Sequence, residues 1–483
     1  MKKIKEFLLK TFPSLKTRQF KAGGYSFVSG AIVLTILIVI NVLVSYIPAS
    51  STQFDMSSAH LYSITSQSKV VVNALEKDVD IYWICQAGEE DDVIESLLNK
   101  YDSLSEHLNV IRKDPDIYPT FASQYTSSTV YNNSIIVECE DKYRYIDYND
   151  IYVASGTAYA SYYEDITYSF DGEGAITSAI DYVVSEDLPK IYFLQGHGES
   201  ELSSTVLKSI EKENYEYDSL SLLNEEVPED CDILMIYAPT SDISDIEKDY
   251  LIDYVNEGGH LLICAGPVQD TTLTNLNAVL ENYAVQVNEG IVIENDYNYY
   301  AFNMPYLLMP DINSDIDITS EIASEGYHIL MPICNGYTIN SNSSYTITSL
   351  LDSSSTSFSK IEGYNLNTYE KEDDDIDGSF ALAVLIESNS NDGKIVCFGS
   401  SLFLDDAYVS YSSGANEDLI LNSLAYMSND DNAAISIRPK SLSYDYLTIS
   451  SSTSTYLKIL MVGIIPLAYL ISGVDTIIRR RKK

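Results

Sequence analysis

Four consecutive residues in the middle of the chain, Gly196-His197-Gly198-Glu199, have the types and spacing of a functional turn. They follow the apolar run Ile191–Leu194, so we expect them at the end of a buried strand, where α/β sheets bind ligands. A histidine there could act as a general base oriented by Glu199. No serine or cysteine nucleophile lies at a comparable turn. The favoured interpretation is therefore structural, with glycines that allow positive φ and a loop hydrogen-bonded by His197 and Glu199. We keep the four residues as a candidate binding site and assign no catalytic residue.

A second cluster of candidate residues has the spacing of half a calcium loop. Asp373, Asp375 and Asp377 precede a glycine in the pattern D-x-D-x-D-G. A complete loop has a bidentate glutamate six residues after that glycine, where this chain has Val384. A solvated acidic turn is the favoured interpretation. If calcium binds, these three aspartates are the expected ligands.

The cysteines and histidines of the chain indicate neither a metal site nor a redox centre. The six cysteines form no CxxC pair and mostly lie in apolar runs, so buried thiols are favoured, although disulfides stay open. Cys264 lies within its strand and lacks the flanking glycines of a nucleophile elbow. The five histidines form no zinc frame, and no phosphate-gripping loop exists, so we expect neither a cofactor nor ATPase activity.

Alternating strand and helix patterns surround the histidine turn and must position it. Helical periodicity over 203–214, 242–256 and 273–283 alternates with apolar strands at 232–237 and 260–265, which predicts an open, mostly parallel, flavodoxin-like sheet. Strands at 380–387 and 393–398 and a helix at 416–427 complete it. Residues 297–375, rich in Tyr, Asn, Ser and Asp, interrupt this alternation and are interpreted as an insertion or flap.

An earlier segment has the element order of a thioredoxin-like domain. Helices are expected at 68–75, 89–103 and 119–125, with strands at 79–85 and 108–112 and a hairpin over 134–146. The redox cysteines of that fold are absent, so its chemistry is not expected. A helix over 172–185 is expected to join this domain to the strand that precedes His197.

Two apolar segments enclose these domains and predict a membrane anchor at each end. Residues 27–47 carry no charge, and residues 456–474 carry only Lys458. A cleaved signal peptide is a poorer match to 27–47, because the apolar run has full span length. Seven basic residues precede residue 27 and five follow residue 474, so both tails are expected in the cytoplasm. The middle is then extracytoplasmic, and the net charge of −42 excludes a nucleic-acid partner.

Four stretches together resemble the auxiliary proteins of gliding-motility-type ABC transporters (the GldG type). They are Phe54–Met56 with Leu61–Thr65, Phe170–Ile180 with Lys190–Glu199, Asp245–Gly259 with Leu261–Ile263, and Ile435–Lys440 with the second apolar segment and Arg479–Arg481. The second contains E-x-x-x-T-x-A-I and GHGE. The resemblance implies an α/β chain with a thioredoxin-like module and a glutamine-amidotransferase-like module that lacks the catalytic cysteine. It also implies a separate permease and ATPase as partners.

These observations predict a definite domain order. Basic tails at 1–26 and 475–483 and spans at 27–47 and 456–474 flank a thioredoxin-like domain at 48–170, an amidotransferase-like domain at 171–430 and a linker at 431–455. The expected function is a non-enzymatic, membrane-anchored, extracytoplasmic subunit of an ABC-type transport system that binds substrate or a partner. The alternatives are a surface hydrolase or amidotransferase-like enzyme using His197 and Glu199, and a structural or adhesive surface protein.

Overall fold

The computed structural model describes residues 29–40, 61–155, 167–342, 344–428 and 437–442. Residues 29–40 form a helix, and none of the helices in these ranges has the length and hydropathy needed to cross a bilayer. The predicted span at 456–474 and both basic tails lie outside the described residues, as do residues 27–28 and 41–47 of the predicted span at 27–47.

The first module is a four-stranded sheet with the order β2-β1-β3-β4. Strands β1 and β2 are parallel, while β3 runs antiparallel to both β1 and β4. The amphipathic α5 begins where the Asp91 side chain accepts the amide of Val93, and it buries Leu97, Leu98 and Tyr101. Its elements are α4 (Ser66–Asn73), β1 (Val79–Ile84), α5 (Asp92–Asp102), β2 (Leu108–Lys113), η2 (Ala122–Gln124), β3 (Ser134–Cys139), β4 (Lys142–Ile146), α6 (Tyr148–Ile151), β5 (Tyr152–Ser155), β6 (Thr167–Phe170) and α7 (Gly172–Val184).

The second module is built on a larger mixed sheet whose core is parallel. Strands β21, β10, β9, β7 and β8 lie side by side in that order and all run in parallel. In chain order this is the 2-1-3-4-5 arrangement of flavodoxin-like sheets, and the predicted α/β fold with a mostly parallel sheet is confirmed. The elements of this core are β7 (Lys190–Leu194), α8 (Ser204–Lys212), β8 (Glu216–Leu220), β9 (Ile233–Tyr237), α9 (Asp245–Asn256), β10 (His260–Cys264), α10 (Thr274–Asn282), β20 (Ala381–Ser388), β21 (Lys394–Phe398), η4 (Leu402–Leu404), α12 (Asp406–Tyr411) and α13 (Ala415–Ser428).

The segment between α10 and β20 adds strands to this sheet and also forms smaller sheets of its own. Strand β20 pairs antiparallel with β21, and β16 and β17 then pair with β20. The segment comprises β11 (Val285–Val287), β12 (Ile291–Ile293), β13 (Leu307–Leu308), β14 (Asp311–Ile312), α11 (Asp317–Ser324), β15 (Met331–Pro332), β16 (Tyr337–Ile339), β17 (Tyr345–Asp352), β18 (Phe358–Lys360), η3 (Gly363–Asn365) and β19 (Ile376–Asp377). After α13, the described chain ends with β22 (Lys440–Ser441). Residues 297–375, predicted as an insertion or flap, thus contribute β14, β16 and β17 to the main sheet.

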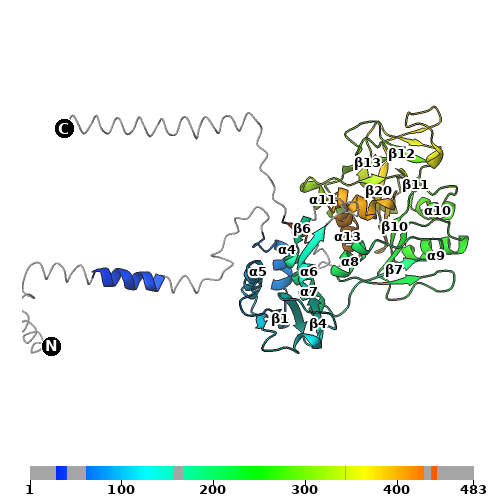
Figure 1. Ribbon diagram of the computed structural model, residues 1–483. Coiled ribbons are helices and arrows are strands. Elements are labelled where there is room, and N and C mark those ends of the chain that lie inside the picture. The colour runs from blue at the N-terminus through cyan, green and yellow to red at the C-terminus, as the bar shows by residue number, and fades with distance from the viewer. Residues whose placement is uncertain (1–28, 41–60, 156–166, 343, 429–436, 443–483) are drawn as a thin grey trace, which may run out of the picture. The chain divides into compact units, whose positions relative to one another are not determined.

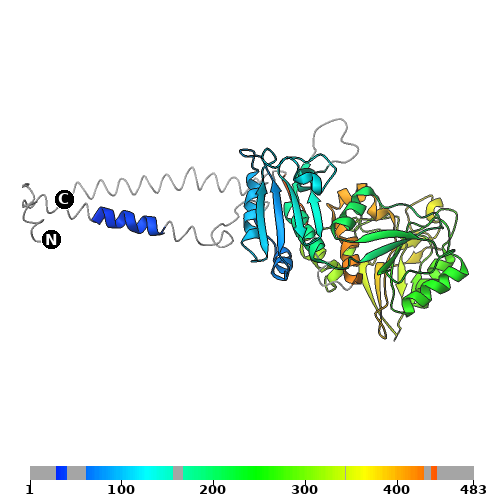
Figure 2. The same ribbon diagram turned by 90° about the horizontal axis from the view of Figure 1, so that it is seen from below.

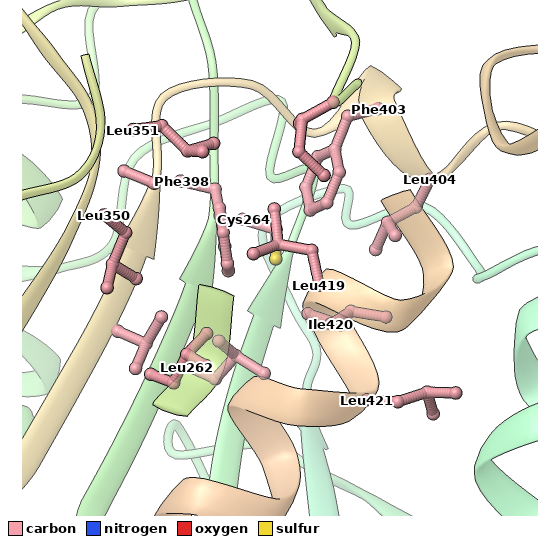
Figure 3. Close-up of a cluster of buried hydrophobic side chains, with 14 of the residues drawn as sticks. Leu262, Cys264, Leu350, Leu351, Phe398, Phe403, Leu404, Leu419, Ile420 and Leu421 are labelled. Carbon is pink, nitrogen blue, oxygen red and sulfur yellow. The ribbon is translucent and has the colours of Figure 1, made fainter. Parts of the chain in front are cut away.

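Helices cover both faces of the large sheet, so its central strands are buried on each side. Helices α9 and α10 pack on one face, and α8 and α13 pack on the other (Figures 1 and 2). Strands β9 and β10 are consequently buried along their whole length and consist almost entirely of apolar residues. Figure 3 shows the face beneath α13, where Leu262 and Cys264 of β10 meet Phe398 and Leu419.

Helix α7 follows the predicted domain boundary at residue 170, but it packs with the first module. The helix packs against β3, β4 and α4, so it covers the sheet of the first module rather than starting the second. Its buried residues occupy most of its circumference, including Ile176, Ala179 and Ile180. The chain therefore passes between modules after Val184, in the loop that precedes β7.

Candidate functional site

The predicted histidine turn lies where the strand order of the large sheet reverses. His197 follows β7, and β7 lies between β8 and β9 in the sheet. This reversal is the position at which open α/β sheets leave a crevice for ligands at the carboxyl ends of their strands. The structure thus places all four predicted residues, Gly196 to Glu199, at the carboxyl end of β7.

Both ring nitrogens of His197 face carboxylates. Nδ1 lies 3.0 Å from Oε1 of Glu199, and Nε2 lies 3.1 Å from Oε2 of Glu247 on α9. All three side chains are nearly inaccessible to solvent, with at most 6% exposed. Only a doubly protonated imidazolium can donate from both nitrogens, and in that form His197 is a cation between two buried carboxylates.

Glu247 connects this cation to the start of a helix. Its Oε2 also accepts the amide of Ser244, while the Ser244 hydroxyl accepts the amide of Glu247, which forms a capping box on α9. Burial by itself would raise the pKa of the Glu247 carboxyl, but the hydrogen bonds at Ser244 and the neighbouring His197 hold it below its usual value. Sequence reasoning did not find Glu247, although S-x-x-E at 244–247 is the signature of this cap.

The backbone of the turn is hydrogen-bonded to the loop that follows β9. The carbonyl of His197 accepts the amides of Thr240 and Ser241 at 3.0 and 2.9 Å, which joins the ends of β7 and β9. Gly198 has a φ of +72°, and a Cβ there would lie 2.1 Å from Oγ1 of Thr240. The glycine is therefore required for close approach of the two loops. The arrangement can hold the loops rigidly, and it leaves neither ring nitrogen available to accept a proton from a substrate.

A second buried carboxylate, Glu173, joins distant parts of the chain. Its Oε1 accepts the amide of Thr65 at 2.6 Å and the hydroxyl of Ser68 at 2.7 Å, and its Oε2 accepts Nζ of Lys440 at 2.8 Å. The same Lys440 ammonium donates to the carbonyl of Ser63 at 2.8 Å. Glu173 is 2% exposed, and although burial opposes ionisation, Lys440 and Thr65 lower the pKa of its carboxyl.

This Glu173 hub brings together three of the stretches that carry the family resemblance. Thr65 belongs to the stretch after the first apolar segment, and Lys440 lies shortly before the second. Thr177, one turn after Glu173 on α7, donates to Ser68 Oγ at 2.9 Å and lies 2.5 Å from the Tyr101 hydroxyl. The glutamate of the E-x-x-x-T-x-A-I pattern therefore contacts both Thr65 and Lys440, and its threonine contacts Ser68, three residues after Thr65.

A third polar cluster lies where the first module meets α8. Lys212 pairs with Asp171 at 2.7 Å, and the carboxyls of Glu213 and Glu417 lie close enough to influence this pair. Desolvation, together with the charges of Asp171, Asp181 and Glu417, raises the pKa of Glu213 to about 8 despite the opposing effect of Lys212.

Glu213→Gln is expected to stabilise the protein in alkaline solution. The native carboxyl holds its proton up to about pH 8, whereas an unfolded glutamate releases it near about pH 4.3, so the native state binds more protons between these values and stability falls as pH rises. Glutamine removes this cost, and we expect a gain of about 1–2 kcal/mol at pH 9 and little change at pH 5. Thermal melts at both pH values measure the gain. Glu216→Gln, on exposed β8, is the control, and an equal response of both variants would contradict the assignment.

Two aspartates of the predicted calcium loop form ion pairs with different lysines. Asp375 is buried and accepts Nζ of the fully buried Lys360 at 3.0 Å, while Asp377 pairs with Lys371 and Asp373 is exposed. Within the described ranges, no group of three His, Cys, Asp or Glu side chains is placed to hold a metal ion. All six cysteines are free thiols, five of them buried, in agreement with the favoured interpretation.

Comparison with known proteins gives one match to a family model. Residues 188–423 match the family model described as ABC-type uncharacterized transport system. No curated protein sequence matches the chain significantly. The match covers β7 to α13, so it includes the histidine turn and the whole core of the large sheet.

Three solved structures have a partly similar arrangement of elements. The mmIFT52 N-terminal domain is 18% identical, with a TM-score of 0.38, and covers 50% of this chain and 98% of its own. PurLQS from Thermotoga maritima is 9% identical, with a TM-score of 0.26, and covers 50% and 100%. Exo-beta-1,4-mannosidase Op5Man5 from Opitutaceae bacterium strain TAV5 is 10% identical, with a TM-score of 0.27, and covers 69% and 48%.

Proposed function

We propose that this chain is a non-catalytic, membrane-anchored auxiliary subunit of an ABC-type transport system, of the gliding-motility type. The match over residues 188–423 supports an association with an ABC-type transport system. The proposed modules are a thioredoxin-like domain, supported by the strand order β2-β1-β3-β4, and an amidotransferase-like domain, supported by the 2-1-3-4-5 parallel core. Both tails are proposed to be cytoplasmic, with the modules outside the cell membrane.

The Glu173 hub is the observation that carries this proposal. A subunit that works beside a permease must transmit force or position between its outer domain and its membrane segments. Glu173 lies on α7 and accepts hydrogen bonds from both Thr65 and Lys440, which follow the first predicted span and precede the second in the sequence. Both membrane-proximal segments are thereby fixed to the same α/β scaffold, so movement of one is coupled to movement of the other.

The geometry of the histidine turn favours this role over the enzymatic alternative. A general base requires a nitrogen that can accept a proton within reach of a substrate. His197 is 5% exposed, and both of its nitrogens are occupied by Glu199 and Glu247. The turn then acts as a structural clamp that supports the sheet edge.

Affinity purification of the tagged full-length chain in mild detergent tests the proposal. We expect a multi-span permease and a P-loop ATPase to be recovered in comparable amounts, identified by mass spectrometry. Recovery of the chain alone, or with cell-wall components alone, would contradict it and favour the adhesive alternative. Deletion of the recovered ATPase should also abolish the function of this chain, whereas an adhesive protein would keep its function.

A further inference from the structure

Five aromatic side chains from three separate segments lie near one another on the second module, and four of them form two ring pairs. We call this the aromatic surface, and it comprises Phe302, Tyr306, Tyr369, Tyr408 and Tyr411. The rings of Phe302 and Tyr411 are 5.1 Å apart, and those of Tyr306 and Tyr369 are 5.7 Å apart. Tyr408 precedes Tyr411 by three residues on α12, so the two lie on one helix face. Burial, Asp405, Tyr306 and Tyr411 together raise the pKa of Tyr408, so one member of each ring pair lies close enough to influence its hydroxyl.

Much of the aromatic surface is open to solvent. Phe302 is 61% exposed, Tyr411 54% and Tyr369 46%, and the neighbouring Met304 is 41% exposed. Large apolar rings that lie together at the surface indicate an interaction site, because scattered exposure would leave them singly. Aromatic and methionine side chains are also the types that are enriched in protein interfaces.

The backbone that presents Phe302 is strained. Phe302 and Asn303 have φ values of +53° and +56°, a conformation that a bulky residue such as phenylalanine rarely adopts. Packing beneath the loop does not require the Phe302 ring, since most of that ring faces solvent. Strain that holds an apolar ring outward is typical of a binding site.

The charge beside these rings is negative. Residues 295–306 and 405–414, which supply Phe302, Tyr306, Tyr408 and Tyr411, contain no lysine or arginine. The exposed Asp405 and Asp406 begin α12, and burial together with the charge of Asp406 raises the pKa of Asp405. A cation placed beside this pair would relieve the repulsion between the two carboxylates.

We infer that the aromatic surface is the docking site for a protein segment rich in lysine and arginine. Exposed rings attract such cations through their faces, and the two aspartates add complementary charge. Helix α12, which supplies Tyr408 and Tyr411, follows β21 at the carboxyl edge of the sheet, where α/β folds place their binding loops. This inference is independent of the transporter assignment, because it rests only on the rings and charges of this surface.

Site-specific photo-crosslinking of the full-length chain in its native membranes tests the inference. The photoreactive residue p-benzoylphenylalanine replaces Tyr411, and a control chain carries it in place of Tyr250, which is 47% exposed on α9. We expect protein adducts at position 411 whose attached peptides contain lysine or arginine, with a yield at least about five-fold above that at position 250.

Two further variants make the result specific to this surface. Asp405→Asn with Asp406→Asn removes the charge while it keeps a side chain that can cap α12, and Phe302→Gly removes the ring and accepts the positive φ. Each is expected to reduce the adducts at 411 at least about five-fold without lowering the melting midpoint. Equal adduct yields at 411 and 250, adducts with glycans alone, or adducts that persist in both variants would overturn the inference.

Discussion

Replacing His197 with alanine is expected to destabilise the protein by about 3–5 kcal/mol, because the substitution leaves two buried carboxylates facing each other without their cation. Glu199 and Glu247 are 5% and 1% exposed, so solvent cannot replace the imidazolium. The thermal midpoint of the full-length chain, followed by circular dichroism, measures the loss. A second substitution, Glu199→Gln in the alanine background, should recover part of it, because one of the two uncompensated charges disappears.

The matched control for this experiment is His107→Ala. His107 also lies beside a carboxylate, with Nδ1 at 2.8 Å from Asp78, but its side chain is 43% exposed. Surface pairs of this kind contribute at most about 1 kcal/mol, so the control should melt almost as the parent does. If His197→Ala melts like the parent but abolishes a measured surface activity, the structural clamp is contradicted and the enzymatic alternative is favoured.

The strands and helices that were predicted from sequence are those in which the pattern of apolar residues matches the residues that are buried in the structure. Strands such as Ile233–Tyr237 and His260–Cys264 are continuous apolar runs because both faces of the sheet are covered. Strand β8, Glu216–Leu220, was missed because it lies at the sheet edge and exposes four of its five residues. The residues of β8 do not alternate between a buried apolar face and an exposed polar face. Only the parallel pairing of β8 with β7 identifies it as a strand.

The candidate site shows a different limit of sequence reasoning. The turn at residues 196–199 was located because glycine and histidine directly follow an apolar run, and its position at the end of a strand is confirmed. Glu247 and Lys440 were not assigned roles, since each contacts a residue that is distant in the chain. The aspartates at 373–377 show the reverse case, in which regular spacing exists but Lys360, a residue outside the motif, takes Asp375.

Glu173→Ala is expected to lower stability by about 3–5 kcal/mol, because it strands the Lys440 ammonium and removes the acceptor for Thr65 and Ser68 in a buried site. Glu186→Ala is the matched control, since Glu186 lies 3.7 Å from Lys77 with its side chain 84% exposed, and it should cost less than about 1 kcal/mol. Denaturant titration of the full-length chain compares the two.

The pH dependence and the location of the effect distinguish the hub from a generic core defect. Because the pKa of Glu173 is lowered in the folded protein, its contribution is present above the unfolded value of about 4.3 and is lost as pH falls through the folded value. Glu173→Gln should therefore be less stable than the parent near neutral pH, and the difference in free energy of unfolding between the two should become smaller in acid. Hydrogen exchange should accelerate at least about ten-fold at residues 61–68 and 437–440, while β9 stays protected. Unchanged exchange at both segments would mean that Glu173 supports the core without tethering these two segments, and the proposed coupling would lose its physical basis.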